Sequence, residues 1–337
     1  MKALAAWSLF ALILMAGLVG QVHAQKNETI LVVVTAPPLE NVVREVGGEV
    51  VEVKSILPPG AEPHSYEPGI QEIITSIQNA SLIVMTGPHH LPVEERIKEL
   101  SEEGLINVPI LNYENYQETG LIVLSILGSG APNPHGYVYS INGLKAIAKA
   151  CASELSRILP EKADYFAKRL KTYLQRLSLL EEKIDKMNVK GTRVILSGPV
   201  LQYIAEDLGL KVEKVIVKAH GAEPSSEDVM EAIRLVRKGE ASLILLSDLE
   251  LAEGSNILRT FQENRIPYVV VPLLELSDQP ELASLITASL LKGGAQPLVQ
   301  PPASSSPLEI LLFPSLLANL ILIFFLILLL MKVRRYG

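Results

Sequence analysis

Apolar and polar positions follow a repeated pattern along this chain from Thr29 to about Leu290. Short apolar runs, such as Ile30 to Val34, have the length of buried strands, and the segments between them carry the apolar spacing of amphipathic helices. This alternation is typical of an α/β architecture with a largely parallel sheet. Strands are predicted at 30–34, 50–56, 82–85, 109–111, 192–196, 212–217, 242–246 and 268–271. Helices are predicted at 38–46, 71–77, 93–100, 161–187, 201–208, 226–237, 254–264 and 281–291, with a further helix that starts near Asn142.

The helix predicted over 161–187 is the longest of these segments. Apolar residues recur every three or four positions from Phe166 to Met187, with charged residues between them, so one stripe stays on one face. An ordinary globular helix is about half as long. At the middle of an α/β chain, such a helix suits a backbone that joins two lobes. A coiled-coil dimer is the alternative, but the stripe is short for one and is closely flanked by α/β segments.

The first 24 residues have the pattern of a secretory signal peptide. Lys2 precedes an apolar run, and Val22-His23-Ala24 closes it with small residues at the cleavage position. We therefore expect cleavage after Ala24. An uncleaved anchor is the alternative, because the apolar run is long for a signal.

The other end of the chain carries a second apolar segment. The stretch from Leu311 to Met331 is almost wholly apolar and is long enough to span the roughly 30 Å of a bilayer core as a helix. Lys332, Arg334 and Arg335 follow it, which predicts a cytoplasmic C-terminus. A buried helix of a soluble core is the alternative, but it would normally show a polar face.

The predicted fold class is α/β, with two lobes that each hold a mostly parallel sheet flanked by helices, joined by one long backbone helix and followed by a C-terminal transmembrane helix. We expect a single-pass protein of the cell membrane whose ectodomain lies outside and is monomeric. The predicted segments are a signal peptide at 1–24, an N-terminal α/β lobe at 25–160, the inter-lobe backbone helix at 161–188, a C-terminal α/β lobe at 189–292, a linker rich in Pro, Ser and Gly at 293–307, the transmembrane helix at 308–331 and a basic cytoplasmic tail at 332–337.

Composition narrows the function of these lobes. The 337 residues carry a net charge of −7 and no basic cluster, so nucleic acid is not an expected partner. Cys151 is the only cysteine, which excludes an intramolecular disulfide and a thiolate metal cluster, and it falls on an apolar stripe as a packing residue. Neither Gly-x-Ser-x-Gly nor His-Glu-x-x-His is present, so a hydrolase is the least favoured class and no enzymatic activity is expected.

A proline-rich stretch, Pro58-Pro59-Gly60-Ala61-Glu62-Pro63-His64-Ser65-Tyr66-Glu67-Pro68, lies between a predicted strand and a predicted helix. Proline fixes its own φ and biases the preceding residue towards extended geometry, so this loop holds one imidazole in a restrained backbone. A surface turn with an incidental histidine is the alternative. In open parallel sheets, ligands bind beyond the carboxyl ends of the strands. The residues predicted at or near such loops are His64, His89, His90, His135, Gly198, Asp248 and Glu275.

This stretch resembles the first-ligand motif of the zinc/manganese-type substrate-binding proteins of ABC importers, and the similarity continues from Thr29 to about Leu290. The resemblance implies that His64 is the first metal ligand. His135, within Asn133-Pro134-His135, matches the second ligand, although Gly136 stands where the family usually has an aromatic residue. Glu275 matches the acidic fourth ligand. The resemblance also implies that both lobes contribute donors and close around the ion.

The third ligand position of the family falls on Gly198, which has no side chain to bind a metal. One account is a three-coordinate site that water completes, which zinc accepts. A second is loss of metal capture in favour of another ligand, or of none. A third is a replacement donor from elsewhere in the chain. A solvated turn is the alternative role for His89 and His90, and a surface position for His220. The candidate replacement donors, in order, are His90, His89, His220 and Asp248.

The function implied by the resemblance is an extracytoplasmic receptor that captures Zn²⁺ or Mn²⁺ and delivers it to an ABC permease and its ATPase. The expected partners are this transporter, the metal ion as transported ligand, and the membrane through the C-terminal helix. The alternative is a binding module or adhesin of the same fold, with a degenerate metal site, that recognises another ligand.

Overall fold

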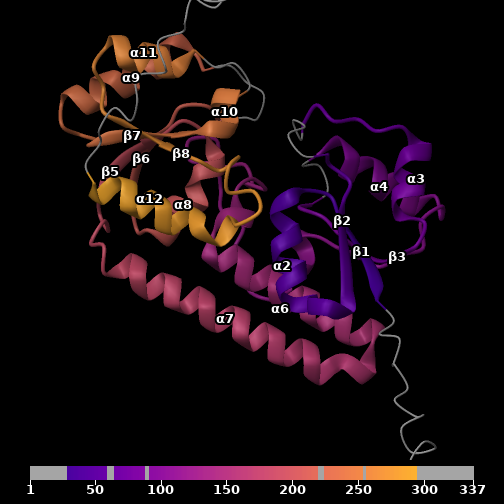
Figure 1. Ribbon diagram of the computed structural model, residues 1–337. Helices are drawn as coiled ribbons and strands as arrows, with labels where there is room; N and C mark the ends of the chain where they lie inside the picture. The colour runs from indigo at the N-terminus through magenta and orange to yellow at the C-terminus, as the bar shows by residue number, and fades with distance from the viewer. Residues whose placement is uncertain (1–28, 59–63, 88–90, 219–223, 253–255, 294–337) are drawn as a thin grey trace, which may run out of the picture.

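The computed structural model describes residues 29–58, 64–87, 91–218, 224–252 and 256–293, which form two lobes above one long helix (Figure 1). The first lobe is coloured indigo to violet and the second is orange, with the long helix beneath both. This arrangement confirms the prediction of two α/β lobes joined by a backbone helix.

The first lobe is built on a parallel sheet with the strand order β2-β1-β3-β4. Its central strand β1 is fully buried at Val32, Val33 and Val34, as expected for a sheet that helices cover on both faces. The strands are β1 (Ile30–Val34), β2 (Val51–Ser55), β3 (Ala80–Val84) and β4 (Ile110–Leu111). The helical elements are α2 (Pro37–Gly47), η1 (Gly48–Val50), α3 (Ile70–Ile77), α4 (Pro92–Glu102), α5 (Tyr113–Glu118), η2 (Tyr137–Tyr139) and α6 (Ile141–Ile158).

The second lobe repeats this topology with the strand order β6-β5-β7-β8, again parallel. In each lobe the chain adds its second strand on one side of the first strand and its third strand on the other, so the switch point lies between β1 and β3, and between β5 and β7. The strands are β5 (Arg193–Leu196), β6 (Lys211–Val215), β7 (Leu243–Ser247) and β8 (Tyr268–Val271). The helical elements are η4 (Pro199–Leu201), α8 (Gln202–Asp207), α9 (Ser226–Arg237), α10 (Asp248–Ala252), α11 (Ile257–Glu263), η5 (Pro280–Leu282) and α12 (Ala283–Lys292).

Helix α7 (Ala163–Asp185), which follows the short η3 (Pro160–Lys162), runs beneath both lobes (Figure 1). Its Arg176 pairs with Glu45 of the first lobe at 3.0 Å and with Glu281 of the second lobe at 3.2 Å. One guanidinium therefore links two carboxylates that belong to different lobes. Its buried stripe, as the pattern predicted, contains Phe166, Tyr173, Leu177, Leu180 and Ile184.

Every predicted strand has a counterpart, with ends that agree or differ by at most two residues. Two short helices were missed. Helix α5 is polar along most of its length and begins at an Asn112 cap, so it has no apolar stripe to reveal it. Helix α10 has only five residues and continues directly from β7, so it is too short for its period to be recognised.

The predicted targeting segments lie outside the described residues. They are the signal peptide at 1–24, residues 294–307 of the linker, the transmembrane helix at 308–331 and the basic tail at 332–337. Within the described part of the chain, no helix combines the length and apolar character that crossing a bilayer requires.

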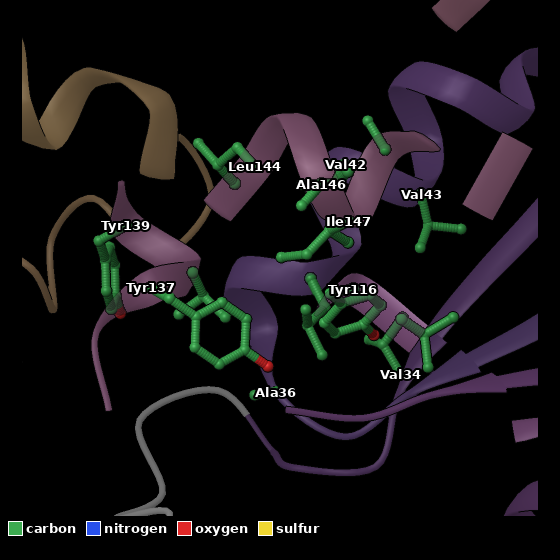
Figure 2. Close-up of a cluster of buried hydrophobic side chains, with 14 of the residues drawn as sticks. Val34, Ala36, Val42, Val43, Tyr116, Tyr137, Tyr139, Leu144, Ala146 and Ile147 are labelled. Atoms are coloured by element: carbon green, nitrogen blue, oxygen red, sulfur yellow. The ribbon is translucent and has the colours of Figure 1, made fainter. Parts of the chain in front are cut away.

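The core of the first lobe contains tyrosines whose hydroxyl groups reach the end of β3. Figure 2 shows Tyr116 and Tyr137 among the aliphatic side chains of α2 and α6. Tyr116 donates a hydrogen bond to the Met85 carbonyl at 2.9 Å, and Tyr137 donates one to the Thr86 carbonyl. Cys151 of α6 is fully buried in the same core, which confirms its packing role. The core thus fixes the loop that begins at the carboxyl end of β3.

Asp207, at the end of α8, fastens the two lobes to each other. One of its carboxylate oxygens accepts hydrogen bonds from the Ile141 amide of α6 at 2.7 Å and from the Ser284 hydroxyl of α12 at 2.8 Å. Burial raises the pKa of Asp207 from 3.8 to about 6, although these donors oppose the shift. Between about pH 4 and pH 6, the carboxyl group of Asp207 is therefore protonated in the folded protein and ionised in the unfolded chain.

We expect Asp207→Asn to change how stability depends on pH. In the native protein, the Asp207 contribution to the free energy of unfolding should fall as pH rises from about 4 to about 6, by on the order of 3 kcal/mol, and stay level above that. The variant should lack this fall. Urea unfolding at several pH values measures it, and parallel curves for the two proteins would contradict the assignment.

Candidate metal site

Two of the predicted ligands, His64 and His135, lie against each other. Their ring centroids are 5.9 Å apart and their planes are inclined by 47°. Two imidazoles that each bind one zinc ion through a nitrogen at about 2 Å place their ring centres roughly 5–6 Å apart. The separation of this pair is therefore compatible with one shared ion.

His64 follows β2, in the loop that the proline-rich motif predicted, and its side chain is partly exposed. The Nε2 atom itself is buried. Downstream, the Tyr66 hydroxyl donates a hydrogen bond to Glu72 of α3 at 2.9 Å. This bond ties the exit of the loop to the helix that follows, so the backbone on that side of His64 is anchored.

His135 is held by a turn that binds the second lobe. The amide of His135 donates to the Asn133 side chain at 3.0 Å, and the same side chain donates to the Pro199 carbonyl at 2.9 Å. Tyr203 of α8 adds a hydrogen bond from its hydroxyl to the Asn133 carbonyl at 2.7 Å and accepts one from the Leu124 amide at 3.0 Å. Asn133 is fully buried, so these bonds are shielded from water.

Gly136 explains the departure from an aromatic residue at this position. Its φ is +86°, a left-handed conformation that glycine adopts readily. A Cβ atom at Gly136 would lie 2.0 Å from the Val200 carbonyl oxygen, which is fixed backbone of η4. Only a residue without a side chain allows the His135 turn to lie this close to the second lobe. The aromatic Tyr137 follows one position later and is buried.

Glu94, at the start of α4, is a buried carboxylate that sequence reasoning missed. It accepts hydrogen bonds from the Thr86 amide at 2.6 Å, the Thr86 hydroxyl at 2.8 Å and the Gly87 amide at 2.9 Å, and from the Thr35 hydroxyl. Burial raises its pKa to about 7 against these donors. It therefore joins the ends of β1 and β3 at the switch point of the first sheet. Its signal was an acidic residue on the apolar face of α4, which also carries Val93, Ile97 and Leu100.

The carboxylate candidates of the second lobe, Glu275 and Asp248, have different surroundings. Asp248 accepts hydrogen bonds from the Leu274 amide at 2.9 and 3.1 Å, and burial raises its pKa while backbone donors at Leu274, Glu275 and Leu273 oppose the shift. It therefore orders the loop that carries Glu275. Glu275 is exposed after β8.

Among the described residues, no three His, Cys, Asp or Glu side chains form a metal-binding group. The structure brings His64 and His135 together, but it does not add Glu275 to form a group of three donors. His89, His90 and His220 lie outside the described residues.

At Gly198, the missing third-ligand position is filled by another side chain. A Cβ atom built on Gly198 would lie 1.9 Å from Oε1 of Glu250. The carboxylate of Glu250 thus stands where a side chain at position 198 would begin. Glu250 was not among the candidate replacement donors, because α10 was not predicted and the neighbouring acid, Asp248, was chosen in its place.

Comparisons with known proteins identify the class of this chain. The family model described as ZnuA, zinc-uptake complex component A, periplasmic, matches residues 32–273. The chain belongs to this family. Membership confirms the prediction of a metal-type substrate-binding protein of ABC importers. The relatives of this ZnuA-family chain are substrate-binding proteins of transporters, which confirms the expectation that it is not an enzyme.

Relatives of similar sequence are named for different metals. The manganese ABC transporter substrate-binding lipoprotein PsaA of Streptococcus pneumoniae serotype 4 is 23% identical over 238 residues, which are 67% of this ZnuA-family chain and 75% of PsaA. The iron-binding protein YfeA of Yersinia pestis is 25% identical over 222 residues, 63% of this chain and 68% of YfeA.

Among solved structures, FpvC from Pseudomonas aeruginosa in complex with Mn²⁺ matches with a TM-score of 0.65 and 20% identity, over 80% of this chain and 98% of FpvC. A zinc-bound deletion mutant of ZnuA matches with a TM-score of 0.64 and 20% identity, over 81% of this chain and all of that one. At this identity the likeness establishes the fold.

We expect Gly136→Ala to destabilise the protein more than Gly130→Ala does. Both glycines have positive φ, at +86° and +75°, so both variants carry backbone strain of about 1–2 kcal/mol. Only at Gly136 does the new Cβ meet a backbone atom, because nothing lies within 4 Å of one at Gly130. Urea unfolding should show an additional loss of roughly 2 kcal/mol for Gly136→Ala. Equal losses would mean that the turn moves freely away from Val200.

Proposed function

We propose that this chain is an extracytoplasmic receptor that captures a divalent transition metal, Zn²⁺ or Mn²⁺, between its lobes and delivers it to an ABC permease and its ATPase. The observation that carries the proposal is the pairing of His64 with His135 at a centroid distance of 5.9 Å. The pair lies where the first lobe meets the second, because the His135 turn is bonded to Pro199 and Tyr203.

The chemistry of the donors supports a transition metal. Imidazole nitrogens suit zinc and its neighbours in the first transition row, and carboxylate oxygens increase the preference for manganese. We propose Glu275 as an acidic ligand from the second lobe. Because Glu275 is exposed and does not form a three-donor group with the histidines, we propose that a movement of the lobes brings it to the ion.

The relatives support a metal cargo without selecting one metal. PsaA is named for manganese, YfeA for iron, and the matched structures hold Mn²⁺ or zinc. This chain departs from the family pattern at Gly198. Its preference among metals therefore depends on the donors of this chain and does not follow from the metals of its relatives.

We further propose that residues 1–24 are a cleaved signal peptide and that 308–331 anchor the ectodomain to the membrane, with the linker at 293–307 as a tether. Roughly fifteen flexible residues reach tens of ångströms, which lets a receptor approach its permease. The relatives named above include lipoproteins, whereas Cys151, the one cysteine of this sequence, is buried within α6. A hydrophobic helix is the anchor that this sequence offers.

A second candidate function rests on Gly198. Without a donor at this position, the same fold can serve as a binding module or adhesin for another ligand. This alternative predicts no stabilisation of the protein by divalent metals.

We expect zinc or manganese to raise the thermal midpoint of the purified full-length chain, and His64→Ala or His135→Ala to abolish the rise. A ligand that binds the folded state stabilises it by RT ln(1 + [L]/Kd), or about 2.7 kcal/mol at a hundredfold excess over Kd. Glu67→Gln, which removes an exposed charge three residues from His64, is the control and should keep the full rise. If no divalent metal shifts the native midpoint, the second candidate function is favoured.

A further inference from the structure

The carboxylate of Glu250 lies directly against Gly198, the position at which the family pattern has its third metal ligand. Gly198 follows β5, and Glu250 lies in α10, which follows β7. Strands β5 and β7 are neighbours in the sheet, and the switch point lies between them. Two segments distant in sequence thus meet at the edge of the sheet where an open α/β fold binds its ligands. In Figure 1, α10 lies on the side of the second lobe that is turned towards the first.

The carboxylate of Glu250 is held in a defined position. Its Oε2 accepts a hydrogen bond from the Ser197 hydroxyl, and its Oε1 stands 1.9 Å from the place of a Cβ at Gly198. The Ser197 side chain is in turn buried and accepts a hydrogen bond from the Ser247 amide at 3.3 Å. Adjacent strands therefore orient the carboxylate through Ser197.

The same segment connects Glu250 to the histidine pair. Gly198 is followed directly by Pro199 and Val200. The Pro199 carbonyl accepts a hydrogen bond from the Asn133 side chain, and the Val200 carbonyl lies where a Cβ at Gly136 would be. Asn133 and Gly136 flank Pro134 and His135. The backbone from Ser197 to Val200 therefore contacts both Glu250 and the turn that carries His135.

We propose that Glu250 is a metal ligand and supplies from α10 the donor that Gly198 lacks. This inference rests on the proposed function. The described residues do not hold Glu250 in one metal-binding group with His64, His135 and Glu275, so the proposal requires the same movement of the lobes. That movement would gather two imidazoles and two carboxylates, four donors of the kinds that zinc and manganese bind. Asp248 has another role, because its oxygens accept the backbone amide of Leu274 and so hold the loop that carries Glu275.

The proposal also gives a reason for glycine at position 198. Any larger residue would place its Cβ on the Glu250 carboxylate as it stands here, so that flexible side chain would have to move aside. Glycine at position 198 therefore leaves room for the carboxylate of Glu250.

The first test is Glu250→Gln in the full-length chain, with Zn²⁺ and Mn²⁺ chlorides as the probes. Glutamine keeps the size of the side chain and can still accept the Ser197 hydrogen bond, but it has no charge. We expect the metal-free midpoint to stay close to the native value and the metal Kd to rise at least about tenfold, since even residues that only support a ligand cost this much. Glu240→Gln, before the opposite end of β7, is the matched control and should bind as the native protein does.

The second test exchanges the donor between the two positions. Gly198→His supplies an imidazole at the family's ligand position and displaces the Glu250 carboxylate, whereas Glu250→Ala alone should weaken metal binding. The double variant Gly198→His/Glu250→Ala should bind metal at least about tenfold more tightly than Glu250→Ala. If Glu250→Gln lowers the metal-free midpoint, the double variant decides the matter.

The outcomes separate this inference from the proposed function. A native chain that binds neither metal overturns both. A native chain that binds, together with a Glu250→Gln variant of equal affinity, overturns the role of Glu250 alone. A double variant that binds no better than Glu250→Ala also overturns it, because the exchange would then have failed.

Discussion

The contact between the His135 turn and the backbone that follows β5 is the constraint on which the rest of the site depends. The buried Asn133 bonds the Pro199 carbonyl, the Tyr203 hydroxyl bonds the Asn133 carbonyl, and Gly136 lies directly on the Val200 carbonyl. A residue with a Cβ at position 136 would separate these surfaces. Because the turn belongs to the first lobe and the backbone to the second, this contact fixes the His135 imidazole where the lobes meet. The centroid of that ring lies 5.9 Å from the centroid of the His64 ring. Buried polar groups that are satisfied in this way specify one arrangement over others.

A carboxylate lies at the switch point of each lobe, fully buried in the first lobe and half-buried in the second. Glu94 joins the ends of β1 and β3, and Glu250 bonds Ser197 at the ends of β5 and β7. Away from these loops, α7 restrains the lobes, because Arg176 pairs with Glu45 on one side and Glu281 on the other. Asp207 adds a second tie through Ile141 and Ser284. Two lobes tied by these contacts favour a small adjustment around an ion over a wide hinge motion.

The fold was largely predictable from the sequence, because buried parallel strands and an apolar stripe along α7 are strong periodic signals. The proline-rich loop likewise marked His64, and Asn133-Pro134-His135 marked the turn that meets it. Other features depend on tertiary contacts that leave no local pattern. Glu250 follows β7 in a helix too short to show a period, and only the pairing of β5 with β7 places it beside Gly198. Asp248 was chosen as a candidate donor because it ends the same strand, yet its oxygens accept the backbone of the Glu275 loop.

The central claim is that two histidines from the first lobe share one metal ion with carboxylate from the second. X-ray absorption spectroscopy at the zinc edge of the zinc-loaded protein tests it most directly. The account predicts four nitrogen or oxygen neighbours at about 2.0–2.2 Å, with the outer-shell scattering of two imidazole rings that falls to one ring in His135→Ala. A spectrum without imidazole scattering, or one that His135→Ala leaves unchanged, would contradict the account.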